Sequence, residues 1–70
     1  MEYTIILEKT RTGYSAHSPD MEGCVAAGKT KDQTIKLMQR ALEFHIKGLK
    51  KDGDPIPMPS SIAATVEIAV

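Results

Sequence analysis

One long segment, residues 30 to 53, carries a helical pattern together with its own start and stop signals. Thr30 and Gln33 have the spacing of a capping box, and Gly53 is the residue type that commonly ends a helix. Between them, apolar residues recur every three or four positions, at Ile35, Met38, Leu42, Ile46 and Leu49. We therefore predict one amphipathic helix that must lay this stripe against a second layer.

Four other segments have the composition and alternation of β-strands and can supply that layer. Proline at positions 55, 57 and 59 excludes both helix and central strand from the segment that follows the helix. The predicted strands are Tyr3–Lys9, Tyr14–Ser18, Cys24–Lys29 and Ile62–Val70. The order βββαβ predicts a two-layer α+β fold, with a four-stranded sheet and one helix on one face. Seventy residues are too few for two cores, so residues 1–70 should form one domain.

A chain of this size buries little surface and needs extra support. The only cysteine, Cys24, excludes an intrachain disulfide, and it does not form a metal-site pattern with His17 and His45. Cys24 follows a glycine in a short apolar segment, where an inert buried thiol is the usual state. We predict no catalytic residue, no metal and no cofactor. Oligomerisation is the support that remains.

The helix also carries a second apolar stripe, Leu37, Ala41, Phe44 and Gly48. Together the two stripes span about 200°, where a surface helix needs little more than about 100°. Two interpretations stay open: a curled sheet and the Pro-rich segment cover the second stripe, or the stripe is an interface with another subunit of a homo-oligomer or with a partner.

The charge balance limits the classes of partner. Nine Lys and Arg offset nine Asp and Glu, whereas proteins that neutralise phosphates normally have a basic excess. No apolar run approaches the roughly 20 residues that span a bilayer. The N-terminus has no basic region of the signal-peptide type. We expect a cytoplasmic protein that binds neither nucleic acid nor membrane.

Asp20 and Glu22 flank Met21 in the predicted loop between the second and third strands. Two nearby carboxylates can bind a cationic partner, or Asp20 can simply cap local amides in a solvated turn. A third hypothesis is a degenerate RNase H-like nuclease that uses Asp20, Glu22 and another acidic residue. Metal-dependent nucleases need several converging carboxylates, and the sequence gives no sign of convergence.

Gly13 to Val25 reads GYSAHSPDMEGCV and resembles the signature gY-x-A-x-x-PD-x-x-GC of the HicB antitoxin family. Ala27 to Thr30, which leads into the helix, and Leu49 to Pro59, which reads LKKDGDPIPMP, are similar to the same family in order and spacing. Where the family often has Leu-Pro, this chain has Met21-Glu22.

The resemblance implies a partial RNase H-like βββαβ fold, with strand order 3-2-1-4 and the last strand parallel to the first. It also implies a non-enzymatic antitoxin that neutralises a HicA-type RNA-cleaving toxin by direct binding. We expect Asp20, Met21 and Glu22 to contact that toxin. Many HicB proteins bind their operator through a further domain, so operator binding is not carried over to these residues. The alternative is a homo-oligomeric orphan module of unknown ligand.

Overall fold

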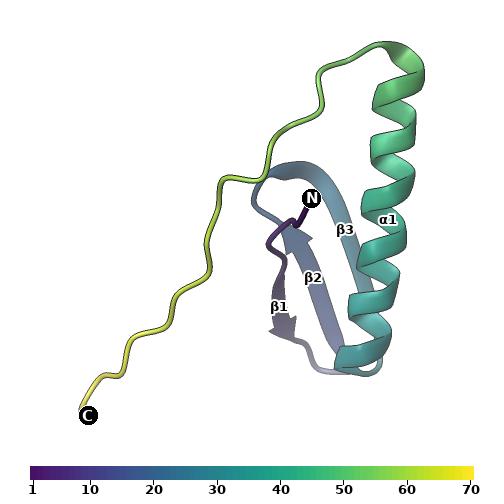
Figure 1. The fold of residues 1–70 in the computed structure, drawn as a ribbon. Helices are drawn as coiled ribbons and strands as arrows, with labels where there is room; N and C mark the ends of the chain where they lie inside the picture. The colour runs from purple at the N-terminus through teal and green to yellow at the C-terminus, as the bar shows by residue number, and fades with distance from the viewer.

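The computed structural model describes residues 1–70 and contains four regular elements. They are β1 (Ile6–Lys9), β2 (Tyr14–Ser18), β3 (Met21–Gly28) and α1 (Lys31–Asp52). Figure 1 shows a meander of three strands with α1 packed along one face of the sheet. After α1 the chain returns past the turn between β2 and β3 and then runs away from the body. The α+β class and the two layers are as predicted.

The sheet has the order β1-β2-β3, and both pairs are antiparallel. Across it, Leu7 lies opposite Ala16, which lies opposite Ala26. This row faces α1, because Ala16 belongs to the core and the other two residues pack against it. The predicted neighbours of the second strand are therefore confirmed.

β3 begins earlier than predicted and is irregular where it begins. His17 lies opposite Val25, but the next residue, Ser18, lies opposite Met21, so three residues of β3 bulge out of the ladder. Gly23, inside the bulge, has φ 81°. The bulge changes the alternation of side chains, and Met21 and Cys24 consequently both enter the core.

Both predicted ends of α1 are confirmed. The Thr30 hydroxyl accepts a hydrogen bond of 3.1 Å from the Gln33 amide, and the Gln33 side-chain oxygen accepts one of 2.9 Å from the Lys29 amide. Gly53 has φ 72°, and its amide reaches the carbonyls of Leu49 and Lys50. The left-handed conformation is one that glycine adopts without strain.

Except at Ile35, the predicted stripe forms the buried face of α1, since Ile46 and Leu49 pack against the core that contains Met38 and Leu42. Thr34, Met38 and Leu42 are its buried residues, whereas Ile35 is 42% exposed. The cause is a close approach to β3, where a Cβ on Gly28 would lie 2.7 Å from the Thr34 hydroxyl oxygen. Thr34 can be buried there because its hydroxyl donates a 2.7 Å hydrogen bond to the Thr30 carbonyl.

The core is small. It consists of five buried apolar residues, namely Ala16, Met21, Cys24, Met38 and Leu42. Partly buried side chains surround them, including Tyr3 and Ile5 from the segment before β1. The predicted first strand began at Tyr3, but residues 3–5 join this core without forming a ladder.

The predicted fourth strand is absent from the sheet, which has three strands. Residues 54–70 contain no helix or strand, and Figure 1 shows residues 62–70 extended away from the sheet. A strand needs a hydrogen-bonded neighbour, and this segment leaves the body before it can pair with β1. No helix combines the length and apolarity needed to cross a bilayer.

The exposure of Ile35 is testable with two substitutions about one helical turn apart. Met38→Ala should reduce the free energy of unfolding by about 2–5 kcal/mol, because it leaves a cavity in a core this small. Ile35→Ala should cost clearly less, because the Ile35 side chain is already partly exposed. Urea unfolding followed by circular dichroism measures both. Equal losses would mean that Ile35 is buried as deeply as Met38.

Candidate binding surface

The Asp20 carboxylate joins the β2–β3 turn to the segment that follows α1. Oδ2 accepts hydrogen bonds from the Ser60 and Ser61 amides at 3.0 and 2.9 Å. Oδ1 accepts hydrogen bonds from the two serine hydroxyls at 3.0 and 2.9 Å. These four bonds, which we call the Asp20 clamp, span 40 residues of sequence. A turn and a chain segment without secondary structure are thereby held together.

Two further contacts attach the same segment to the residues before β1. The Tyr3 hydroxyl donates to the Pro57 carbonyl at 2.6 Å, and the Thr4 hydroxyl donates to the Ser61 carbonyl at 2.7 Å. The Ser18 hydroxyl at the end of β2 donates to the Thr4 carbonyl at 2.8 Å. Residues 57–61 are therefore fixed against the end of the sheet although they form no strand.

The clamp changes the acidity of Asp20. The Ser61 amide, then the Ser60 amide and the two hydroxyls, lower the pKa of the Asp20 carboxyl from 3.8 to about 2, and partial burial opposes them. Hydrogen bonds donated to a carboxylate favour its charged form. Asp20 is consequently an anion whose four contacts are all internal to this chain.

The three predicted partner-binding residues have different places. Asp20 forms the clamp, so its carboxylate is already engaged. Met21 is only 1% exposed and belongs to the core, so its side chain cannot contact a partner on the folded surface. Glu22 is exposed on the bulge of β3. Only Glu22 presents a free side chain of the kind that the sequence analysis expected.

The sheet face that points away from α1 is uncovered. One cross-strand row on this face contains Ile6, His17 and Val25, and all three side chains are exposed. Val25 is 68% exposed. Glu8, on the same face of β1, places Oε1 3.9 Å from His17 Nδ1. This outer sheet face offers apolar, basic and acidic groups at one surface.

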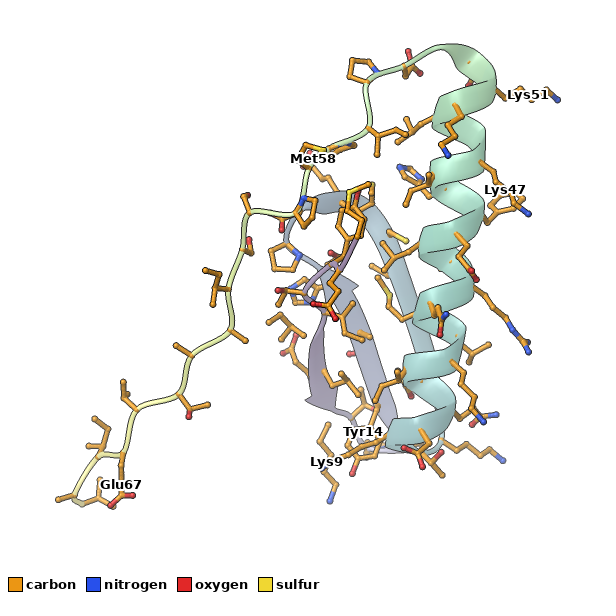
Figure 2. All side chains as sticks on the ribbon, viewed as in Figure 1. Lys9, Tyr14, Lys47, Lys51, Met58 and Glu67 are labelled. Atoms are coloured by element: carbon orange, nitrogen blue, oxygen red, sulfur yellow. The ribbon has the colours of Figure 1, made fainter.

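Positive and negative side chains are divided between the layers. α1 has net charge +3, and the rest of the chain balances it with −3. Figure 2 shows Lys47 and Lys51 on α1 pointing away from the sheet. The charged residues of α1 are Lys31, Lys36, Arg40, Lys47, Lys50 and Lys51 against Asp32, Glu43 and Asp52. Of the acidic residues outside α1, only Glu8 and Glu22 lie on strands, and with Lys9 they give the three strands a net charge of −1.

The four residues of the second apolar stripe of α1 differ in solvent exposure. Leu37 and Ala41 are half-buried, and Ala41 packs against the core. Gly48 is exposed, and Phe44 is 80% exposed. Neither the sheet nor the Pro-rich segment covers Phe44. The interpretation that these two elements cover the second stripe is therefore wrong for Phe44.

The chain's thiol and carboxylates do not form a catalytic arrangement. Cys24 is buried, and burial raises the pKa of its thiol, which keeps it protonated and unreactive. No three His, Cys, Asp or Glu side chains gather as metal ligands would. Asp20, the first residue of the nuclease hypothesis, directs both carboxylate oxygens at serines.

The clamp was not predicted by the sequence. Asp20 was considered as a cap for local amides, but the amides that it binds lie in a distant segment. Ser60 and Ser61 directly follow Pro59, and no periodicity or motif relates them to the turn. The contact depends on the path of the chain after α1, which proline excludes from regular structure but does not otherwise define.

Fold and surface together define a small α+β domain with an uncovered sheet face. Residues 3–69 match the sequence profile of the HicB-like antitoxin of bacterial toxin–antitoxin systems. The chain belongs to this family, as the resemblance had predicted.

Relatives and a solved structure agree with the assignment. A UPF0150 protein of Synechocystis is 33% identical over 97% of this chain and 87% of its own length. An uncharacterised protein of Haemophilus phage HP1 is 36% identical over 89% of this chain, which spans about half (47%) of the phage protein. Among solved structures, a chain of the HicA3 and HicB3 toxin–antitoxin complex matches with TM-score 0.73 and 35% identity. The match covers 84% of this chain and 70% of the other.

Acid titration tests the Asp20 clamp. Because the folded pKa of Asp20 is lowered, the clamp is intact above the ordinary value near 3.8 and opens as the pH falls through about 2. The amide resonances of Ser60 and Ser61 should therefore shift together with a midpoint of about 2 in NMR spectra. Asp20→Asn should remove this transition, and Glu22→Gln should retain it. A midpoint near 3.8 would show that the carboxylate does not hold the serines in solution.

Proposed function

We propose that this chain is an antitoxin that neutralises a HicA-type RNA-cleaving toxin by binding it directly. The observation that carries the proposal is the likeness, at 35% identity and TM-score 0.73, to a chain of a solved HicA3 and HicB3 complex. Membership of the HicB-like antitoxin family supports the same role. Neutralisation by binding requires no catalytic group of this chain.

The division of charge supports a particular orientation. A protein that cleaves RNA must present positive groups to phosphates. The exposed Glu8 and Glu22 on the sheet complement such a surface, whereas the positive excess of α1 would repel it. We therefore place the toxin on the outer sheet face, with α1 turned away. Bound there, the antitoxin occupies the surface that RNA would contact.

Glu22 and Glu8 are the acidic contacts that this orientation requires. Both side chains are exposed, and they extend from opposite edge strands, β3 and β1. The clamp holds the turn beside Glu22, so little ordering is needed when a partner binds. In this proposal Asp20 acts indirectly, by fixing the turn, and Met21 acts only through the core.

Charge reversal on the sheet side tests the orientation. Glu8→Lys combined with Glu22→Lys should slow association with a HicA-type toxin, because rim charges mainly govern the approach of a charged partner. The probe is a purified HicA-type toxin, and association is measured by surface plasmon resonance across a salt series. Attraction that weakens with salt in the wild type should become repulsion that salt relieves. Growth rescue in cells that express the toxin provides a second measurement.

Glu43→Lys is the control, because it reverses an exposed glutamate on α1 and not on a strand. It should leave the association rate and its salt dependence close to those of the wild type. If the double variant binds like the wild type at every salt concentration, the outer sheet face is not the toxin surface. If the wild type does not bind, the orphan-module alternative replaces the antitoxin proposal.

We also propose that the stripe of Leu37, Ala41, Phe44 and Gly48 is a self-association surface. Phe44 supports this because an aromatic side chain that is 80% exposed is unusual without a partner. Gly48 is exposed one turn along the helix and permits close approach of a second backbone.

The single buried thiol fits a reducing compartment, and we place the protein in the cytoplasm.

Sedimentation of Phe44→Lys tests the stripe. A lysine at the centre of the interface should weaken self-association by about 2 kcal/mol or more, so the variant should sediment as a smaller species than the wild type. The variant should stay folded, because the Phe44 side chain contributes little to the core. Glu43→Lys, on the next residue, should sediment like the wild type. An unchanged assembly in Phe44→Lys would remove this surface from the proposal.

A further inference from the structure

Residues 62–70, which we call the arm, have the character of a strand without a sheet. Apolar residues occupy every second position of the arm, and Thr65, Val66, Ile68 and Val70 are of types that favour or tolerate strands. All nine residues are exposed, with Ile62 at 91% and Val66 at 82%. Figure 2 shows Glu67 near the far end of the arm, remote from the sheet. A contiguous exposed apolar face of this kind indicates a binding partner.

The base of the arm is fixed, so the arm leaves the body in a defined direction. The Asp20 clamp and the Thr4 hydroxyl hold Ser61, the residue just before the arm. Residues 59–63 and the first four residues of the chain line one shallow hollow. Beyond this hollow the arm runs away from the sheet, as Figure 1 shows. Pro57 and Pro59 stiffen the approach and disfavour a reversal of direction.

The sheet has an edge that fits such an arm. β1 pairs with β2 on one side only, and its other side presents unpaired backbone groups. Exposed edges of this kind pair readily with strands from another chain. The opposite edge, β3, is interrupted by the bulge at Gly23, which disfavours regular pairing. β1 is consequently the edge that can accept a strand.

We infer that the arm pairs with β1 of a second copy of this chain, and that two copies exchange arms reciprocally. The same surface patch then serves both subunits, as a two-fold symmetric dimer requires. The exchange gives each body a fourth strand and covers the arm's apolar residues. It also supplies the support that a core of five buried apolar residues lacks. Because one chain offers both an unpaired sheet edge and an unpaired strand, the arm of a second copy is favoured as the partner of β1 over a strand of an unrelated protein.

This inference goes beyond the proposed function, and its test needs no toxin. Labelled and unlabelled chains are unfolded together, refolded as a mixture, and examined by isotope-filtered NMR. Contacts should appear between the labelled β1 amides of one chain and the unlabelled arm methyl groups of another. If the arm contacts only its own β1, or gives the signals of an unstructured peptide, the inference is wrong.

A second experiment uses prolines, which remove backbone donors from a strand. Thr65→Pro combined with Val66→Pro should weaken the arm-mediated dimer by roughly tenfold or more, because two neighbouring donors, one facing each side, are lost. Sedimentation is measured in the Phe44→Lys background, so that the helix stripe cannot hold the copies together. Thr65→Ser with Val66→Thr is the matched control and should keep the dimer. A dimer that survives the double proline would overturn the exchange, whereas the signals of β1, β2 and β3 report that the body is folded.

Discussion

The Asp20 clamp is the contact on which the path of the chain after α1 depends. Four hydrogen bonds from Ser60 and Ser61 to Asp20 join the β2–β3 turn to the proline-containing segment after α1, although that segment has no secondary structure. Without the clamp, the hydrogen bonds between residues 55–70 and the rest of the chain would be the two that Tyr3 and Thr4 donate. The position of the β2–β3 turn and the direction of the arm therefore both follow from one carboxylate.

The second constraint is the closeness of α1 to the sheet. Glycine at position 28 lets the first turn of the helix approach β3, and that approach selects Thr34 for the interior. Side chains at Ile35 and Phe44 are correspondingly turned toward the flanks. A small core and two partly exposed flanks are thus results of the same packing, and they explain why this domain has apolar surface available for assembly.

The sequence was a good guide to local structure and a poor one to long-range placement. Thr30, Gln33 and Gly53 predicted the helix ends because capping depends on residues within one turn. The order of the first three strands followed from short connections. The sequence analysis placed Met21 in a loop, whereas the structure places it in β3 and in the core. The bulge at Gly23 causes this difference, because it changes the alternation of side chains on which the strand prediction was based. Alternation at residues 62–70 predicted a strand, but alternation does not say which chain supplies its neighbour.

For the candidate surface too, a local feature could be predicted from the sequence and a long-range contact could not. Glu22 was recognised by its residue type and its place next to a turn, and it is exposed. The engagement of Asp20 could not be predicted, because Ser60 and Ser61 carry no signal that relates them to a residue 40 positions away.

The arrangement of contacts also has a consequence for how the molecule forms. β1, β2, β3 and α1 each pack against elements nearby in sequence, and the connections between them are short. Chains with such local contacts fold rapidly, because little loop-closure entropy opposes them. Pairing of the arm is a different event, since it joins segments far apart in sequence or in separate molecules. The body can thus acquire its structure on its own timescale, and assembly then proceeds at a rate set by the concentration of finished subunits.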